Sequence, residues 1–204
     1  MLYLASHSPS RQQLLRDCKI DFVAVGHSAV EESIERLGKT LKETTQAIAR
    51  LKIAHVALPE SRSVGELCWV LSADTMGTEQ DGIVRGKPRD ILHARQMLVS
   101  ARQGTICGTA FCVDRRVWDG NQWVIEESRE GYVESQLIFN VPDDKLDEYC
   151  SQVAVCSVSG GIAIENYGAQ FLISIIGSYT TIVGLPVYEV VHKLYELGWK
   201  KITS

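Results

Sequence analysis

The sequence predicts an α/β fold in which helices flank a mixed β-sheet. Strand-like and helix-like apolar segments alternate in the first half of the chain, whereas strand-like segments follow one another directly in the second half. The length of 204 residues suits one domain, or a domain with a small lobe. Hydrophobic residues make up 45% of the chain and charged residues 23%, which is usual for a globular protein.

The first strand and the first helix are expected to meet in a polar turn. "LYLA" reads as a short buried strand, and Ser8 is placed to cap a helix that has Pro9 in its first turn. Backbone N–H groups at the start of a helix are unpaired and favour an anion. With the hydroxyls of Ser6 and Ser8 and the charge of Arg11, this turn suits a phosphate group. A capped helix with a surface arginine is the alternative.

A second strand, "DFVAVG", precedes an acidic stretch that contains Glu31 and Glu32. Thr40 and Glu43 form a capping-box pattern, which predicts the start of a second helix. Lys52 lies on this helix and should be close to its buried face. The predicted buried stripe of the helix consists of Ala47, Leu51, Ala54 and Leu58.

The most apolar strand, "LCWVL", should lie in the centre of the sheet and end in "SADT". Asp74 in that segment could hold a metal ion, act as a general base on water, or cap a backbone turn. Asp81 and Gly82 mark a turn, and Lys87 follows in the constrained segment "GKP". Asp90 can cap the next helix, whose apolar face should consist of Ile91, Ala94, Leu98 and Ala101.

The second half of the chain begins with the strand-like segments "TAFCVD", "QWVIEE" and "YVESQLIF", with a turn at "DGN". A helix is expected over about Asp143–Val153, with Leu146 and Tyr149 pointing inward. "SVSGGIAIENYGAQ" is glycine-rich and should be irregular, and "FLISII" should be a further strand. The last helix should follow "GLP" and stop at Gly198.

Charge and composition exclude several classes of protein. The formal net charge is −4 and the isoelectric point about 5.8, so nucleic acid is not expected as a partner. No apolar run reaches the length of a membrane span and the N-terminus does not resemble a signal peptide, so we expect no membrane association and a cytoplasmic location. The six cysteines form no CxxC pair, and free thiols are favoured over a metal or redox site.

The polar residues after the predicted strands could together handle a polyphosphate. Arg11, Lys52 and Lys87 would supply three cations, although each lysine alone could be a solvated surface residue. Glu31 and Asp74 could hold a hard divalent ion through oxygen ligands, as Mg²⁺ often bridges carboxylates and substrate phosphates. The reaction suggested is attack by water on a phosphoanhydride. No serine or cysteine nucleophile with an obvious partner is visible, which disfavours a covalent mechanism.

Several segments resemble the motifs of one family in order and spacing. They are "LASHSPSRQQLL", Glu31, Lys52 in "ARLKIA", "SADT" with "GKPRD", "GGIAIENYGAQF" and "IIGSYTTIVGLPVYEV". On these motifs, which cover most of the chain, the protein resembles the Maf family of nucleoside triphosphate pyrophosphatases. The resemblance implies hydrolysis of a nucleoside triphosphate to monophosphate and diphosphate with a divalent cation, Mg²⁺ or Mn²⁺. It also implies one Maf-like domain over residues 1–204, built as an elongated mixed sheet with two lobes around a cleft. This is a Maf- or ITPase-like fold, and members of the family often form a homodimer.

The family's motifs also suggest a role for each candidate residue. Asp74 would be the general base and, with Glu31, would hold the metal ion. Arg11, Lys52 and Lys87 would neutralise the phosphates of the substrate.

The remaining candidates would contact other parts of the nucleotide. Ser6 and Ser8 would offer hydroxyl and backbone contacts to phosphate, while Ser10, Thr75 and Glu165 would face the base. Ser10 replaces the first of two arginines usual in the family, and Glu165 replaces a usual glutamine. Glutamate there is typical of a branch that acts on 7-methyl-GTP, whereas Thr75 is typical of the pyrimidine-preferring branch.

These departures leave alternatives to the enzyme hypothesis. A further substitution, Ser157-Val158 for the usual Asp-Lys, removes one possible phosphate-binding lysine. A nucleotide-binding regulatory protein with weak or lost catalysis is therefore the alternative function. A third reading, an α/β domain whose polar turns only cap helices, explains each motif alone but not their joint order.

Overall fold

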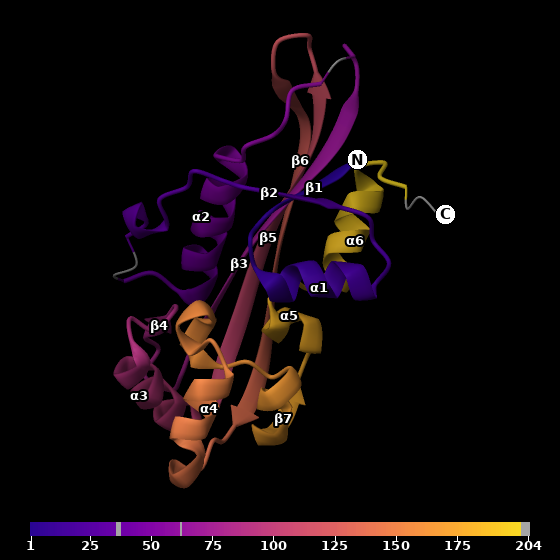
Figure 1. Cartoon of the computed structure of the whole chain (residues 1–204). Coiled ribbons are helices and arrows are strands. Elements are labelled where there is room, and N and C mark those ends of the chain that lie inside the picture. The colour runs from indigo at the N-terminus through magenta and orange to yellow at the C-terminus, as the bar shows by residue number, and fades with distance from the viewer. Residues whose placement is uncertain (36–37, 62, 201–204) are drawn as a thin grey trace.

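The computed structural model describes residues 1–35, 38–61 and 63–200 and contains one mixed sheet flanked by helices, as predicted (Figure 1). The described strands follow the spatial order β2-β1-β3-β5-β6-β7, and β4 pairs with the end of β3. Strand β1 is parallel to β2 and β3, whereas the other described pairs are antiparallel. The molecule is elongated along the long strands β3, β5 and β6 (Figure 1).

The elements have the following bounds. The strands are β1 Leu2–Ala5, β2 Val23–Val25, β3 Leu67–Thr78, β4 Val84–Arg85, β5 Thr105–Trp118, β6 Trp123–Phe139 and β7 Leu172–Ile176. The α-helices are α1 Pro9–Asp17, α2 Leu41–Ala54, α3 Ile91–Ala101, α4 Leu146–Gln152, α5 Tyr179–Val183 and α6 Val187–Glu196. Short 3₁₀ turns cover Glu31–Ser33, Asp143–Lys145, Val155–Ser157, Ser159–Gly161 and Asn166–Phe171.

The predicted helix caps are confirmed. Ser8 caps α1, accepting a hydrogen bond from the backbone N–H of Arg11, and Pro9 is the first helical residue. Thr40 and Glu43 form the capping box of α2, and the Asp90 side chain accepts from the backbone of His93 at the start of α3. The local sequence therefore determines where these three helices begin.

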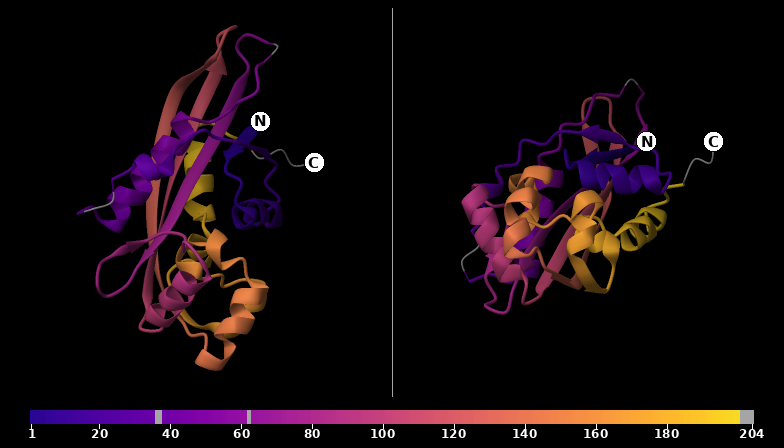
Figure 2. Two further views of the ribbon diagram at one scale, coloured as in Figure 1. Left: turned by 60° about the vertical axis from the view of Figure 1, so that its left-hand side comes forward. Right: turned by 60° about the horizontal axis from the view of Figure 1, so that its bottom comes forward.

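The two faces of the sheet carry different helices, because successive side chains of a strand point to opposite faces. Helix α2 packs on one face, and α1, α6 and the helices of the second half of the chain lie on the other (Figure 2). On that second face, the first apolar cluster gathers β1, α1 and α6 around Leu71, Phe111 and Leu194. The second cluster gathers α3, α4 and β7 around Phe139 and Tyr149. These clusters are the cores of a first and a second lobe.

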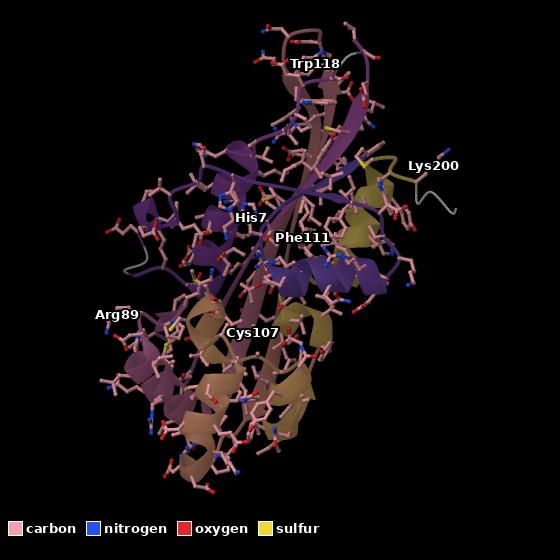
Figure 3. The ribbon with its side chains drawn as sticks, viewed as in Figure 1. His7, Arg89, Cys107, Phe111, Trp118 and Lys200 are labelled. Atoms are coloured by element: carbon pink, nitrogen blue, oxygen red, sulfur yellow. The ribbon has the colours of Figure 1, made fainter. Side chains whose placement is uncertain are left out.

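Strand β5 joins the two lobes. Its residues Trp118, Phe111 and Cys107 mark a path along most of the molecule (Figure 3). Phe111 belongs to the first cluster and Cys107 to the second, so one strand supplies both cores.

Some predicted elements differ from the structure. The strand "LCWVL" does not end in "SADT" but continues through it to Thr78, because Ser72 and Asp74 find polar partners on α2 instead of requiring a turn. The strands predicted at "QWVIEE" and "YVESQLIF" form one strand, β6, and the short helix α5 was not predicted. The helix expected over Asp143–Val153 begins as a 3₁₀ turn and ends at Gln152, but Leu146 and Tyr149 are buried as predicted.

The predicted buried stripe of α2 was wrong. The helix ends at Ala54, which is exposed, and Leu58 lies beyond it. The buried face also carries polar residues, so the apolar residues of the sequence do not recur along it with a helical period. It consists of Leu41, Thr44, Thr45, Ile48, Ala49, Lys52 and Ile53.

Three further observations concern helix α6, helix α3 and membranes. Val190 and Leu194 of α6 are buried and Gly198 follows the helix in a left-handed conformation, with φ of 75°. Ile91 of α3 is half-exposed, so it does not belong to the buried face predicted for that helix. Among the helices in the described ranges, none has the length and apolarity needed to cross a bilayer.

Candidate active site

The candidate site lies where one edge of β3 has no neighbouring strand in the described residues. Along one edge of β3, strand β5 pairs with every residue of β3. On the other edge, pairing with β1 ends at Leu71 and pairing with β4 begins at Gly77. Asp74 and Thr75 lie in the gap, and because they are adjacent in a strand their side chains point to opposite faces. The turn after β1 and the segment after β4 border this gap.

On the α2 face, Lys52 joins two carboxylates. Its Nζ lies 2.7 Å from Oδ1 of Asp74 and 3.0 Å from Oε1 of Glu31. The side chains of Lys52 and Asp74 are each 7% exposed, and that of Glu31 is 32% exposed. Oδ2 of Asp74 is buried and has no hydrogen-bond partner among the described residues. An unpaired buried carboxylate oxygen is expensive, so it marks a position for a polar ligand.

The two carboxyl groups have opposite pKa shifts. Burial raises the pKa of Asp74 above its usual value, although Lys52 and Arg11 oppose this effect. Burial would also raise the pKa of Glu31, but the charge and hydrogen bond of Lys52, with the charge of Lys87, outweigh it and lower that pKa. A carboxylate with a raised pKa is a stronger base than an ordinary one, and one with a lowered pKa keeps its charge. This difference suits Asp74 to accept a proton and Glu31 to remain an anion.

On the opposite face, Arg11 is bound by backbone and hydroxyl oxygens. Its guanidinium group donates from Nε to the carbonyl of Gly184 at 2.7 Å, and from Nη1 to Oγ of Ser6 at 3.2 Å. Nη2 donates to Oγ1 of Thr75 at 3.1 Å. Arg11 is only 9% exposed, so it is a buried cation and not the surface arginine that was the alternative.

The first turn is preorganised by its own hydroxyls. Oγ of Ser6 accepts from the backbone N–H of Ser8 at 3.2 Å, and Ser6 itself is only 4% exposed. Ser8 and Ser10 are half-buried at the start of α1. His7 follows Ser6 in the same turn and lies near the middle of the molecule in this view (Figure 3). The predicted strand–turn–helix junction is therefore confirmed, and it borders the β3 gap.

Lys87 belongs to the electrostatic surroundings of the carboxylates. It is exposed, and its charge contributes to the lowered pKa of Glu31. The preceding residue, Gly86, accepts a backbone hydrogen bond from Gly160 at 3.0 Å, and Oγ of Ser159 donates to the carbonyl of Arg85 at 3.1 Å. The glycine-rich segment thus holds the lysine-bearing segment in place.

Glu165 lies on the side of the second lobe. It is half-buried, directly before the 3₁₀ turn Asn166–Phe171. Burial raises the pKa of Tyr179, and the nearby charges of Glu165 and Asp17 add to this. Burial raises the pKa of Tyr149 as well, and the charge of Glu165 adds to this, so Glu165 lies near both α4 and α5.

His27 is a residue of this region that we did not predict from the sequence. Its Nδ1 is buried and has no hydrogen-bond partner among the described residues. Burial lowers its pKa, and the charge of Lys52 lowers it further. The signal was in the strand register: Ala5 pairs with Val25 in parallel, so His7 and His27 follow two neighbouring strands at equivalent positions.

Thr109 is a second residue that the motifs did not reveal. It is fully buried on β5 opposite Thr75, with the two hydroxyl oxygens 2.9 Å apart. Oγ1 of Thr109 donates to the carbonyl of Thr181 at 2.7 Å. No local pattern distinguishes this threonine from others in strands.

The donor set fits a divalent cation that arrives with a phosphate ligand. No group of three or more His, Cys, Asp or Glu side chains within the described ranges is arranged to hold a metal ion by itself. Asp74 and Glu31 offer two carboxylates, and one oxygen of Asp74 is unpaired. Mg²⁺ is usually held by one or two carboxylates together with substrate phosphates, and this arrangement meets that requirement.

The chain is similar to known proteins over nearly its full length. Residues 1–197 match the family model described as Maf-like protein. A dTTP/UTP pyrophosphatase of Syntrophotalea carbinolica is 31% identical over 198 residues, which cover 97% of this chain and 84% of that protein. A dTTP/UTP pyrophosphatase of Thermotoga maritima is 28% identical over 205 residues, covering 100% and 92% of the two chains.

Among solved structures, a HAM1 protein from Coxiella burnetii matches 67% of this chain and 72% of its own, at 20% identity. Its TM-score of 0.26 is too low to relate the two folds. The match of the family model over residues 1–197 and the relative at 31% identity are sufficient by themselves. The chain belongs to the family of Maf-like proteins.

Proposed function

We propose that this protein is a nucleoside triphosphate pyrophosphatase. It hydrolyses the bond between the α and β phosphates and releases a nucleoside monophosphate and inorganic diphosphate. The observation that carries this proposal is the pair of carboxylates joined by Lys52 at the β3 gap, beside the N-terminal turn of α1. The names of the relatives, dTTP/UTP pyrophosphatase, support the same reaction.

Asp74 is the general base in this proposal. Its Oδ1 is held by Lys52, so its position is fixed, while Oδ2 has no protein partner in the described residues and can accept a proton from water. Burial raises its pKa, which strengthens it as a base. The hydroxide equivalent formed attacks phosphorus, and diphosphate leaves.

The phosphate groups are neutralised by cations and by backbone donors. The charges of Lys52 and Lys87 both lower the pKa of Glu31, against the effect of burial, so both lysines lie near that carboxylate. The hydroxyl groups of Ser6 and Ser8 and the backbone N–H of Ser10 at the start of α1 offer further donors. Arg11 adds its positive charge to this region.

A divalent cation, Mg²⁺ or Mn²⁺, would be held by Glu31 and Asp74. When bound it would polarise the phosphate oxygens and lower the barrier to attack. Lys52 keeps the two carboxylates charged and close before the ion and the substrate arrive.

Ser10, Thr75 and Glu165 are proposed to select the base. Thr75 and the names of the relatives favour pyrimidine nucleotides, so dTTP and UTP are the first substrates to examine. The carboxylate of Glu165 would favour a positively charged or hydrogen-bond-donating base, so modified nucleotides belong in the same panel. A homodimer, which the family resemblance implies, is part of the proposal. Its mass in solution would be twice the 22.6 kDa of the chain.

The experiment is a diphosphate-release assay over standard and base-modified nucleoside triphosphates, with Mg²⁺, with Mn²⁺ and with a chelator. We expect equimolar monophosphate and diphosphate from at least one nucleotide, and no release with the chelator. Tight nucleotide binding without release from any substrate would instead favour the alternative, a regulatory protein with lost catalysis. Release of inorganic phosphate in place of diphosphate would contradict the proposed bond cleavage.

A further inference from the structure

Arg11 makes more hydrogen bonds with the protein than is expected of an arginine that binds a substrate phosphate. Three of its nitrogen atoms donate to protein oxygens, at 2.7 to 3.2 Å, and the side chain is buried. A guanidinium group has five N–H donors in a fixed planar fork, so these three bonds define its orientation completely. An arginine that waits for a phosphate at the surface would instead keep its fork open to solvent.

The three acceptors belong to segments far apart in the sequence. Ser6 is in the turn after β1, Thr75 is on β3, and Gly184 is between α5 and α6. The carbonyl of Gly184 lies 173 residues from Arg11 along the chain. Gly184 has a φ of 122°, a backbone conformation that favours glycine, so another residue at position 184 would be strained.

A second set of hydrogen bonds connects the same segments. Oγ1 of Thr75 lies 3.4 Å from the carbonyl of Gly184 and 2.9 Å from Oγ1 of Thr109. Thr109 in turn donates to the carbonyl of Thr181 on α5. Arg11, Thr75 and Thr109 thus hold both ends of the segment from Thr181 to Gly184, which we call the α5–α6 junction.

The α5–α6 junction is where the two lobes meet. Val183 packs against both apolar clusters, Ile182 packs against the second cluster, and Leu185 is fully buried in the first. A shift of this junction would therefore change the position of the second lobe relative to β3. Thr75, the β3 residue that holds the junction, is adjacent to Asp74.

We propose that Arg11 is a positioning residue: it clamps the α5–α6 junction to β3 and to the first turn, and so fixes the second lobe relative to the Asp74 carboxylate. As far as it concerns catalysis, this inference rests on the proposed function. It reassigns Arg11 from a ligand of the phosphates to a support of the residues that surround them. Lysine cannot replace arginine in this role, since a single ammonium group cannot reach three acceptors in a plane.

The test compares Arg11→Lys with Lys87→Met, which removes a proposed phosphate contact. For Arg11→Lys we expect kcat to fall roughly tenfold to a hundredfold, as displaced reacting groups do, with KM changed less than about threefold. For Lys87→Met we expect mainly a higher KM and a weaker dependence of KM on salt. If Arg11 bound the substrate phosphates, Arg11→Lys would give the opposite pattern, with KM raised and kcat retained because lysine keeps the charge. This result would overturn the proposal.

Hydrogen exchange supplies a readout that does not depend on catalysis. Peptides that span residues 179–187 should exchange faster in Arg11→Lys than in the wild type, and at the wild-type rate in Lys87→Met. Unchanged exchange of these peptides in Arg11→Lys would overturn the clamp even if turnover fell. If the wild type hydrolysed no nucleotide, the proposed function would fail, while this exchange experiment would still decide the role of Arg11.

A double-mutant cycle tests whether Arg11 and Thr75 act through the same network, provided that peptides of β6 exchange in each variant as they do in the wild type. Thr75→Val keeps the shape of the side chain and removes the hydroxyl that Arg11 binds. Because both changes break the same network, the double variant Arg11→Lys/Thr75→Val should exchange no faster at the α5–α6 junction than the more affected single variant. Additive effects of the two changes would show that they act separately and would contradict the clamp.

Discussion

Lys52 is the residue on which the charge balance of the site depends. It is a buried cation between a buried carboxylate and a half-buried one, with both distances at or below 3.0 Å. A buried ion pair need not stabilise a protein more than apolar residues would, but removal of one partner leaves the other charge unpaired. Lys52 therefore has a structural role as well as the proposed catalytic one.

Replacement of Lys52 by methionine should lower the free energy of unfolding at pH 7 by about 3–5 kcal/mol, the usual effect of breaking a buried pair. The difference from wild type should shrink as the pH falls toward about 4, because the unpaired Asp74 then takes up a proton in the folded state. Urea unfolding at pH 7 and pH 5 measures this. Lys145→Met, which breaks an exposed pair with Glu148, is the control and should change stability by less than about 1 kcal/mol.

The pH dependence of turnover tests the role of Asp74. A general base must be unprotonated, so kcat/KM should fall as the pH decreases through its raised pKa. Lys52 and Arg11 lower that pKa, so Lys52→Met should move the acid limb to higher pH than in the wild type. Since both proteins use the same nucleotide, ionisation of the substrate cancels from the comparison. An acid limb at the same pH in both would contradict the assignment.

Among the elements, α2 carries Lys52 and has to be fixed against the sheet. Arg116 of β5 donates to the carbonyl of Ile53 near the C-terminus of α2 at 2.8 Å and to the carboxylate of Asp114 at 2.6 Å. Asp114 is 1% exposed and Arg116 8% exposed. This buried pair holds the end of the helix next to Lys52.

Arg116→Met should destabilise the protein by about 3–5 kcal/mol, since it leaves the Asp114 carboxylate buried without its cation. Arg129→Met removes a half-exposed arginine from pairs with Glu127 and Glu196, and should have an effect below about 1 kcal/mol. Thermal or urea unfolding of the two variants measures the difference. Equal effects would contradict the role given to the buried pair.

The elements with strong local signals were predictable. The caps at Ser8, Thr40 and Asp90 were readable because a side chain and a backbone N–H three residues away suffice to form them. The extent of β3 was not, because Ser72 and Asp74 resemble turn residues until their partners on α2 are known. The buried stripe of α2 was predicted wrongly for the same reason, since Lys52 can be buried there because Asp74 and Glu31 pair with it.

The candidate site shows the same division. The order of the motifs in the sequence predicted which residues belong to the candidate site, but not which of them contact one another. The bond between Arg11 and Gly184 spans most of the chain, and the partners of Thr75 on β5 depend on strand register. His27 and Thr109 were not found because each becomes informative only through a neighbour on another element.

At the scale of the whole molecule, the residues of the proposed site come from both lobes. The turn before α1 belongs to the first lobe, Asp74 and Lys52 lie between β3 and α2 on the other face of the sheet, and Glu165 lies with the second lobe. A ligand that contacts both should therefore stabilise the entire fold rather than one part of it.

A nucleoside triphosphate analogue that cannot be cleaved, added with Mg²⁺ at about 100 times its Kd, should stabilise the fold by about 2.7 kcal/mol. For a chain of this length that corresponds to a rise in Tm of roughly 5 to 10 °C. Differential scanning fluorimetry measures it, with the nucleoside alone as a control that lacks the phosphates. An equal rise with the nucleoside would contradict a site built around phosphate groups.

The most direct measurement is diphosphate release by Asp74→Asn, compared with the wild type and with Asp119→Asn in the exposed turn between β5 and β6. The asparagine keeps the shape of the side chain but cannot accept the proton. We expect at least about a hundredfold loss of kcat, with the protein folded and the nucleotide still bound, and no loss in Asp119→Asn. Wild-type turnover by Asp74→Asn would contradict the account.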